Sequence, residues 1–564
     1  MLPKQVIWSA VLAVTISVAI NATFLTGTER QMKDEILHGF RQFDETGRLT
    51  PELSIIMKQI PLSSISGLTS SSTSPVTRES LTCLACLAAV DIMKIYIDTH
   101  TRDQVYNLVV ALCLDLTDYK EEVCLGSVGL HLDPILYIYK HTANLPAARL
   151  CGIVFQGSQC FVDEPSLEWS IDIDPGSKSE DNRIEDKKAH AASPLTIIQL
   201  SDIHQQEDYL PGGNAACGLP ICCRINQGPP PSPDAAAGYW GNGGCDIPMH
   251  HFENTLKQIK NTHENIDFIY ITGDIVDRVV WDTKIPTNIG VLTNITERLL
   301  TTFPNTPVYT VFGNHEPSPL NVFAPHYITD ETVSVNWLYN LSINLWSHWL
   351  PPETNETILR GGYYTALAKP GFRIIGLNNN VCYPENWWMI HNPKDQDGQL
   401  QWLADTLLQA EKNGEKVHIL GHITSDQCFR TWAREFRRIV SRFENTITAI
   451  FKGHTHSDQF NVYYSFDRPG HATGVAFNGA SVTPGPNSNY KVYTVDPNNY
   501  TVLNSESWMY ILTDANKNPS EDPSWYQAYS FKDVFGVQSM SAIEMGNLTH
   551  TLAKNRPLLE EYAR

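Results

Sequence analysis

Five short apolar runs in the second half of the chain each lead directly into aspartate, asparagine or histidine. The motifs that follow these runs are Asp202-x-His204, Gly273-Asp274, Gly313-Asn314-His315, Gly421-His422 and Gly453-His454-Thr455-His456. The runs have the length and composition of strands, and open α/β folds bind ligands beyond the carboxyl ends of their strands. We therefore expect the nitrogen and oxygen ligands of these motifs to converge on one spot: Asp202, His204, Asp274, Asn314, His422, His454 and His456.

These residue types indicate a metal centre. A single His-x-His pair such as His454 and His456 is equally compatible with a polar loop, but an ordered set over about 255 residues is not. Neutral imidazole together with carboxylate suits Zn²⁺. Two such ions about 3.5–4 Å apart can neutralise a phosphodiester and activate water. The sequence contains neither a Gly-x-Ser-x-Gly motif nor a phosphate-binding P-loop.

Six of the 12 cysteines lie between residues 83 and 160. They are separated by 2, 26, 10, 26 and 8 residues, which is nearly a mirror-symmetric pattern. This pattern favours the nested pairs Cys83–Cys160, Cys86–Cys151 and Cys113–Cys124, although six cysteines permit 15 pairings. Apolar residues recur between the cysteines at intervals of three and four, which predicts helices.

The disulfide spacing and helical periodicity of residues 81–161 resemble those of saposin B-type domains. That resemblance implies a domain that opens a concave apolar face to membrane lipid. The alternative is a disulfide-bonded helical bundle with an ordinary core.

The remaining N-terminal segments resemble export and linker sequences. Residues 1–22 have the lysine and short apolar run of a signal peptide, and residues 23–80 form an N-terminal segment with a helix near 30–43 and a Ser/Thr-rich linker. Residues 162–193 are acidic and lack apolar periodicity, which predicts a second linker. A secreted or lysosomal location is expected, with N-glycosylation at Asn294, Asn340, Asn355, Asn499 and Asn547.

In order and spacing, the ligand motifs resemble those of the calcineurin-like metallophosphoesterases. This resemblance implies a four-layer α/β/β/α sandwich over residues 194–485, followed by a C-terminal region at 486–564, within an α+β multidomain chain. It also implies two Zn²⁺ per chain. Asp274 would bridge the ions, His315 would be the general acid, and the other ligands would divide into Asp202, His204 and His456 for one ion and Asn314, His422 and His454 for the other.

A saposin-type domain followed by this phosphoesterase resembles the acid sphingomyelinase family over residues 81–540. The resemblance implies hydrolysis of sphingomyelin to ceramide and phosphocholine, with the saposin-type domain presenting lipid from the membrane surface. It also implies pairing of the remaining cysteines as Cys217–Cys222, Cys223–Cys245 and Cys382–Cys428.

The chain departs from the family pattern in three places. Arg278 stands where the family has a histidine, and we expect it to contact the substrate phosphate. Residues 422–427 read His-Ile-Thr-Ser-Asp-Gln in place of the family's His-Ile-Pro-Pro-Gly-His, and no cysteine follows Cys428. These differences leave the headgroup preference and pH optimum open.

Two other functions are compatible with the sequence. One is a phosphodiesterase of soluble substrates such as nucleotides, which the charge of Arg278 would suit. The other is a lipid-binding glycoprotein without catalysis, which would have no need of seven intact metal ligands. The net charge of −20 at pH 7 argues against nucleic acid as a partner.

Overall fold

The computed structural model describes residues 27–60, 80–156, 160–176 and 193–563. The predicted signal peptide and most of the Ser/Thr-rich linker lie outside these residues, as does the stretch 177–192. Within the described residues, no helix combines the length and apolar character needed to span a bilayer.

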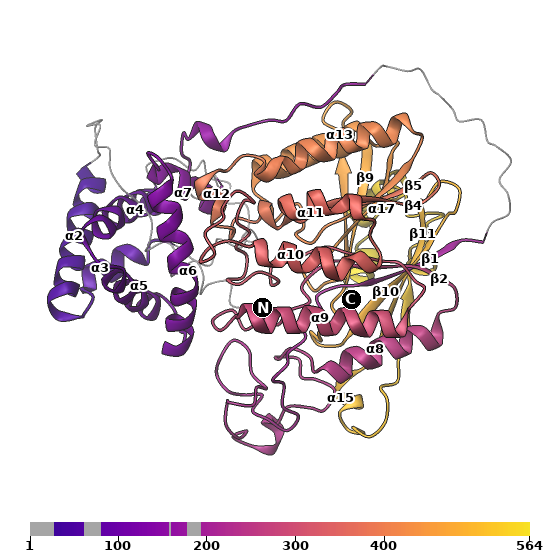
Figure 1. The fold of residues 1–564 in the computed structure, drawn as a ribbon, viewed down its shortest axis with the longest axis horizontal. Helices are drawn as coiled ribbons and strands as arrows, with labels where there is room; N and C mark the ends of the chain where they lie inside the picture. Colours follow the sequence, from indigo (N-terminus) through magenta and orange to yellow (C-terminus); the bar gives the residue numbers. More distant parts are fainter. Residues whose placement is uncertain (1–26, 61–79, 157–159, 177–192, 564) are drawn as a thin grey trace.

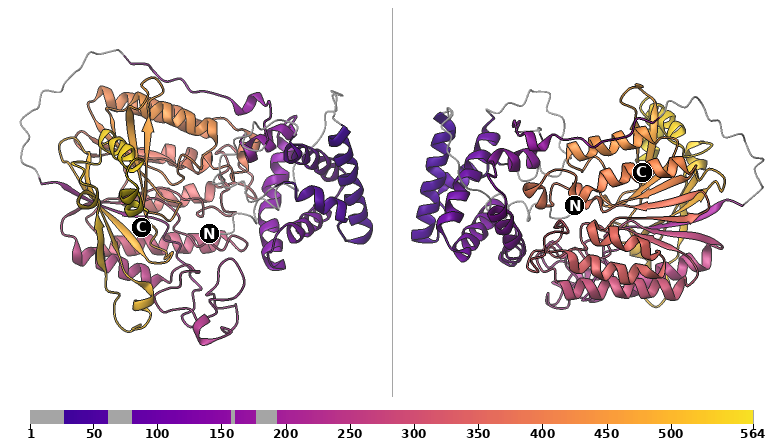
Figure 2. Two further views of the ribbon diagram at one scale, coloured as in Figure 1. Left: turned by 180° about the vertical axis from the view of Figure 1, so that it is seen from behind. Right: turned by 45° about the horizontal axis from the view of Figure 1, so that its top comes forward.

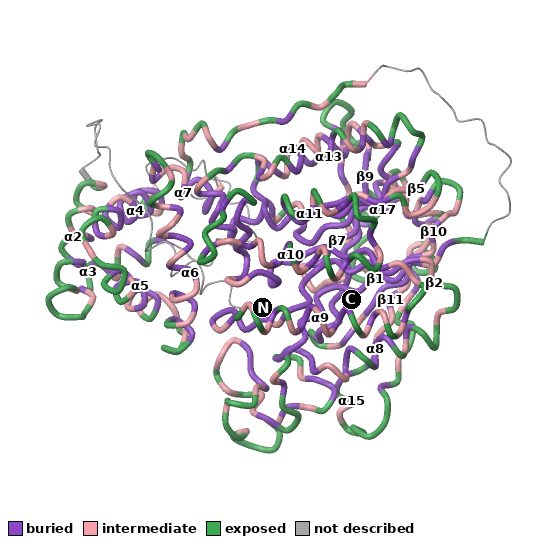
Figure 3. Tube along the Cα trace, in the orientation of Figure 1, coloured by how far each residue is buried: buried purple, intermediate pink, exposed green. Residues whose placement is uncertain are grey.

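The N-terminal unit is a group of helices held together by three disulfide bonds (Figure 1). Its four cysteine-bearing helices are α4 (Leu81–Thr99), α5 (Arg102–Leu116), α6 (Glu121–His141) and α7 (Ala147–Phe155). The three nested pairs predicted from the spacing are all present. Two of them link α4 to α7 and to Cys160, which follows α7, and the third links α5 to α6. A helix that is apolar on every side must be covered on every side. The first half of α4 is such a helix, and it is buried continuously from Cys83 to Val90 (Figure 3).

Two further helices complete this unit and account for the burial of α4. The helix expected near residues 30–43 is present as α2 (Gly27–Thr46), and it is followed by α3 (Pro51–Met57). Both helices pack on α4 and α5, with Phe40 and Leu53 fully buried. The helical unit therefore begins at α2, before the boundary expected at residue 81.

The C-terminal unit contains two six-stranded mixed sheets. The first has the order β12-β11-β10-β1-β2-β3 and the second β4-β5-β6-β7-β9-β8. Strands of the first sheet are β1 (Leu195–Leu200), β2 (Ile266–Ile271), β3 (Val308–Thr310), β10 (Asn489–Val495), β11 (Val502–Met509) and β12 (Tyr526–Ser530). Those of the second are β4 (Tyr364–Lys369), β5 (Phe372–Gly376), β6 (Lys416–Leu420), β7 (Ile447–Lys452), β8 (Gln459–Tyr464) and β9 (Ala472–Asn478). Because β10 pairs antiparallel with β1, the domain boundary expected at residue 485 cuts through the first sheet.

The two sheets pack face to face through buried aromatic side chains. The rings of Tyr270 on β2 and Phe451 on β7 lie 5.0 Å apart, and Gln199 on β1 donates a hydrogen bond to the carbonyl of Lys452 at 2.9 Å. Helices lie on the outer sides of this pair of sheets (Figure 1, Figure 2). They are α8 (Met249–Thr262) and α9 (Ile285–Thr302) at the first sheet, and α13 (Gln399–Lys412), α14 (Arg430–Arg442) and α17 (Ala542–Leu552) at the second.

In the described part of the chain, six shorter helices complete the C-terminal unit, and one of them contacts the helical unit. They are α10 (Asn336–Leu345), α11 (Asn355–Gly361), α12 (Trp388–His391), α15 (Leu512–Ala515), α16 (Phe531–Phe535) and α18 (Arg556–Tyr562). Helix α12 contacts α6 and α7 of the helical unit. Just before it, the fully buried Trp387 donates its indole N–H to Nδ1 of His131 at 2.9 Å. Burial lowers the pKa of His131 to about 3, so its ring is a neutral acceptor at this interface.

Candidate metal centre

The structure brings together all seven ligands expected from the sequence. Each follows the carboxyl end of a strand: Asp202 and His204 follow β1, Asp274 follows β2, Asn314 follows β3, His422 follows β6, and His454 and His456 follow β7. The parallel neighbours β1, β2 and β3 in one sheet and β6 and β7 in the other bring these ends to the same edge. The side chains form two groups that share Asp274.

The first group is Asp202, His204, Asp274 and His456. Nε2 of His204 lies 3.1 Å from Nε2 of His456 and 3.5 Å from Oδ2 of Asp274. Nε2 of His456 lies 3.4 Å from Oδ1 of Asp202. Donor atoms this close together can share one divalent cation.

The second group joins Asp274 to His422 and His454, with Asn314 beside them. Oδ1 of Asn314 lies 3.0 Å from Nε2 of His422 and 2.8 Å from Nδ1 of His454. The two imidazole nitrogens are 3.3 Å apart, and Oδ2 of Asp274 is 3.3 Å from Nε2 of His422. These atoms are close enough together to bind one cation. Asp274 is the one carboxylate that belongs to both groups.

Five of the ligands adopt backbone conformations that L residues rarely occupy. Their φ angles are positive: 52° at Asp202, 45° at His204, 58° at Asp274, 74° at His454 and 55° at His456. Such conformations cost free energy and persist where the surrounding structure enforces them, typically at functional sites. Five of the seven expected ligands are therefore held in strained backbone conformations.

The glycines of the motifs serve mainly to let loops approach closely. Gly273 is the motif glycine that turns through positive φ, at 89°. A Cβ on Gly313 would lie 2.1 Å from Oδ1 of Asp274, and one on Gly453 would lie 2.2 Å from Oγ of Ser201. Gly273 is thus required by its backbone conformation, whereas Gly313 and Gly453 are required by the space around them.

Two residues that support the ligands were not singled out from the sequence. The buried carboxylate of Glu316 accepts backbone N–H groups from Asp274 at 3.2 Å and Ile275 at 2.6 Å, which ties the loops after β2 and β3 together. Oδ1 of Asn379 accepts the backbone N–H of His422 at 2.7 Å. The position of Glu316 directly after the Gly-Asn-His motif could have indicated its role, but Asn379 stands in no comparable pattern.

The electrostatics of the first group favour a bound cation. Burial raises the pKa of Asp202 to about 7 and lowers the pKa of His456 to about 3; it also lowers that of His204 well below its usual value. A buried carboxylate beside neutral imidazoles brings oxygen and nitrogen lone pairs together at one place. The donor set therefore fits a divalent metal with nitrogen and oxygen ligands.

His315 and Arg278 lie beside the ligands. Nδ1 of His315 is 3.0 Å from the carbonyl of Asp277, and its Nε2 is 4.0 Å from Oδ2 of Asp274. Nε of Arg278 forms an ion pair with Asp246, whose other oxygen accepts the backbone N–H of Arg278 at 2.6 Å. The guanidinium that was expected to contact the substrate phosphate is thus paired with a buried carboxylate.

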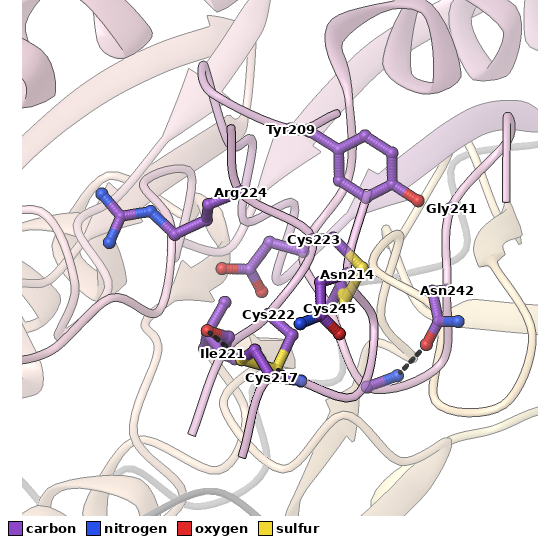
Figure 4. The surroundings of a disulfide bond; sticks show 12 residues. Tyr209, Asn214, Cys217, Ile221, Cys222, Cys223, Arg224, Gly241, Asn242 and Cys245 are labelled. Carbon is purple, nitrogen blue, oxygen red and sulfur yellow. Dashed lines mark hydrogen bonds between the residues drawn. A yellow bond between two sulfur atoms is a disulfide. The ribbon is translucent and has the colours of Figure 1, made fainter. Parts of the chain in front are cut away.

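A disulfide-bonded loop positions Asp246. Cys223 is bonded to Cys245, the residue before Asp246, and Cys217 is bonded to Cys222 (Figure 4). The carbonyl of Cys245 also accepts a hydrogen bond from Nη2 of Arg278 at 3.1 Å. These two bridges and the Cys382–Cys428 bridge are the pairs that the family resemblance implies.

A cavity of about 530 Å³ opens onto the centre. Asp274, Asn314, His315, His454 and His456 line it. Its wall also includes Arg278, Asn321, Tyr383, Glu385 and Asp426. The cavity is large enough to hold a polar headgroup against both ligand groups.

Comparison with known proteins identifies the family. Residues 195–458 match the calcineurin-like phosphoesterase model. The chain is 34% identical over 494 residues to a sphingomyelin phosphodiesterase of Bos taurus, covering 86% of this chain and 77% of that protein. It is also 34% identical to the Homo sapiens sphingomyelin phosphodiesterase, over 81% of this chain and 73% of the relative. Sphingomyelin phosphodiesterase 1 of Caenorhabditis elegans is 30% identical, over 85% and 87%. The chain therefore belongs to the sphingomyelin phosphodiesterase family and carries its metal centre in a calcineurin-like phosphoesterase domain.

Proposed function

We propose that this protein is a zinc-dependent phosphodiesterase that hydrolyses sphingomyelin to ceramide and phosphocholine. The observation that carries the proposal is the convergence of two ligand groups on one cavity in a chain whose relatives are sphingomyelin phosphodiesterases. Asp202, His204 and His456 would hold one ion, and Asn314, His422 and His454 the other; Asp274 would bridge them. When bound, the two ions supply charge neutralisation for the phosphate and lower the pKa of water.

The roles of the neighbouring residues follow from their hydrogen bonds. Nδ1 of His315 is directed at the Asp277 carbonyl, which leaves Nε2 on the cavity side to protonate the departing ceramide oxygen. Arg278 holds the phosphate by charge. Its ion pair with Asp246 fixes the guanidinium in place and reduces the positive charge that it offers to the substrate.

The same ion pair bears on the alternative of a soluble, more anionic substrate. A nucleotide diester with further phosphates would favour an unpaired cation at the cavity wall. The pairing of Arg278 with Asp246, together with the presence of the helical unit, favours a lipid with a single phosphate.

A direct assay tests the proposed function. Sphingomyelin vesicles and a nucleotide diester would be compared at acid pH, with and without a chelator. We expect phosphocholine release from sphingomyelin, loss of release with chelator and recovery with added zinc. A preference for the nucleotide diester would replace the proposal with the soluble-substrate function. Absence of hydrolysis with zinc present would indicate a lipid-binding protein without catalysis.

We further propose that the N-terminal unit is a saposin-type domain that attaches the enzyme to the membrane surface. Its helices expose several large apolar side chains, including Leu114 and Leu125, each 39% exposed. These two leucines directly follow Cys113 and Cys124, which are bonded to each other, so they lie on the same disulfide-linked helix pair. Apolar side chains at such a position suit insertion into a lipid interface.

Replacing Leu114 and Leu125 by glutamate is expected to reduce hydrolysis of vesicle sphingomyelin at least about tenfold. Burying one leucine side chain contributes about 1.5–3 kcal/mol, and 1.4 kcal/mol corresponds to a factor of ten. Hydrolysis of a soluble diester should not change, because both residues lie outside the cavity. Leu367→Glu, at a 53% exposed position on β4, is the matched control. Equal losses on both substrates would argue for a structural role instead.

Passage through the secretory route is part of the same proposal. Six disulfide bonds are typical of an oxidising compartment. Three of the glycosylation sequons, at Asn340, Asn499 and Asn547, are exposed, and those at Asn294 and Asn355 are partly exposed. All five are thus accessible enough for modification. A secreted or lysosomal destination fits both observations.

A further inference from the structure

A chain of buried polar side chains runs from the second ligand group into the cavity wall. Nδ2 of Asn314 donates to Oδ1 of Asn321 at 2.9 Å, and Nδ2 of Asn321 donates to Oε2 of Glu385 at 2.8 Å. The other carboxylate oxygen, Oε1, accepts the hydroxyl of Tyr383 at 2.9 Å. All four residues are buried, with exposures of 1–5%.

The donor-to-acceptor direction of these hydrogen bonds is set by the Glu385 carboxylate, where they end. Both oxygens of the Glu385 carboxylate accept hydrogen bonds, one from Asn321 and one from Tyr383. When it is ionised, the Glu385 carboxylate only accepts, and this matches the arrangement in which Asn321 turns its NH₂ group toward Glu385 and its oxygen toward Asn314. Asn314 must in turn donate with its NH₂ group. Its Oδ1 is thereby directed at Nε2 of His422 and Nδ1 of His454.

The orientation of the Asn314 side chain matters because only the oxygen of an amide group binds a cation. The oxygen of asparagine has lone pairs for a metal, whereas its NH₂ group presents two hydrogens. If the amide of Asn314 turned over, it would place hydrogens against the second ligand group. The buried chain therefore removes an unproductive orientation of a proposed ligand.

Tyr383 connects the same chain to a further ligand. Its ring packs edge to face with that of His454, with centroids 5.2 Å apart. Because Tyr383 also donates to Glu385, one short segment supports both Asn314 and His454. The Cys382–Cys428 bridge fixes one end of that segment. At the other end, Trp387 donates a hydrogen bond to His131 of the helical unit.

We propose that Asn321 and Glu385 are positioning residues that set the amide orientation of Asn314 and thereby the affinity of the second cation site. The inference rests on the metal centre of the proposed function. Residues that orient a metal ligand typically contribute about 10–100-fold to metal affinity. Tyr383 adds to the effect by holding Glu385 and His454.

The test is a zinc titration of the full-length protein and of the variants Asn321→Leu and Glu385→Ala. Elemental analysis and competition with a chelator report the two sites separately from activity. We expect both variants to keep one tightly bound equivalent and to bind the second about 10–100-fold more weakly. Turnover should fall and then recover at high zinc. Glu385→Gln retains an oxygen that can accept from Asn321 and should restore most of the affinity.

Asn386→Leu is the matched control. Asn386 is fully buried and accepts the backbone N–H of Phe323 at 3.1 Å, but it has no hydrogen bond to Asn314, Asn321 or Glu385. This variant should lower the melting temperature and still bind two equivalents of zinc with normal affinity. A shared loss of zinc in all variants would trace the effect to general destabilisation and overturn the proposal.

Two other results would also overturn it. Asn321→Leu and Glu385→Ala could bind both equivalents of zinc with unchanged affinity. They could also raise KM without any effect that added zinc reverses, which would make them substrate contacts. The zinc measurements do not depend on which diester is hydrolysed. A protein that binds two zinc ions but leaves sphingomyelin intact would refute the proposed function and leave this inference standing.

Discussion

Asp274→Asn is expected to abolish turnover and to reduce bound zinc from two equivalents to at most one. Asp274 is the one carboxylate shared by the two ligand groups, with Oδ2 at 3.5 Å from Nε2 of His204 and 3.3 Å from Nε2 of His422. Asparagine offers one neutral oxygen in place of a charged carboxylate, so it cannot neutralise two cations held close together. Elemental analysis and a diester assay on the purified variant would measure both effects.

Asp277→Asn is the control for this substitution. Asp277 lies three residues further on and belongs to neither ligand group. Its side chain accepts the backbone N–H of Val279 at 3.1 Å, a bond that an asparagine oxygen can also make. The control should bind two zinc ions and remain active. Two equivalents of zinc and normal turnover in Asp274→Asn itself would refute its assignment as the bridging ligand.

His315→Ala is expected to lower turnover about 10²–10⁴-fold while the zinc content stays at two equivalents. This is the usual range for the loss of a general acid. The neighbouring Arg278 cannot replace it, because a guanidinium keeps its proton at any working pH and is already engaged with Asp246. His315 would therefore carry the acid role alone, and kcat measured under saturating zinc would report its loss.

The leaving group distinguishes an acid from a substrate contact at His315. A diester with a good leaving group needs little protonation, so His315→Ala should be far less defective on it than on sphingomyelin. Arg278→His should retain activity, since it introduces a second imidazole beside the same cavity. Equal defects on good and poor leaving groups would contradict the acid role.

Much of the centre could be predicted from the sequence because its ligands are local to strands. A strand such as β7 is marked by its apolar composition, and His454 and His456 follow its end within four residues. In each of the two sheets, parallel neighbouring strands bring such ends to the same edge. For the same reason, helical periodicity and cysteine spacing were enough to predict the cysteine-bearing helices and the nested pairs such as Cys83–Cys160.

Other features depended on contacts between distant segments. The strand β10 lies beside β1 although nearly 300 residues separate Gln199 from Lys491, its pairing partner, so the boundary placed at residue 485 had no local signal to correct it. The helix α2 was expected from its own sequence, but its packing on α4 was not, because an amphipathic pattern does not specify a partner.

What the sequence by itself determined is therefore which side chains follow which strands, and hence a candidate metal centre. What only the tertiary structure decided is how those side chains are held. Arg278 is paired with Asp246, and Asn314 is oriented by Asn321 and Glu385. These supporting residues lie in irregular loops, where no period marks them. A hydrogen bond depends on distance and direction between two groups, and for loop residues both are fixed only when the whole fold has packed.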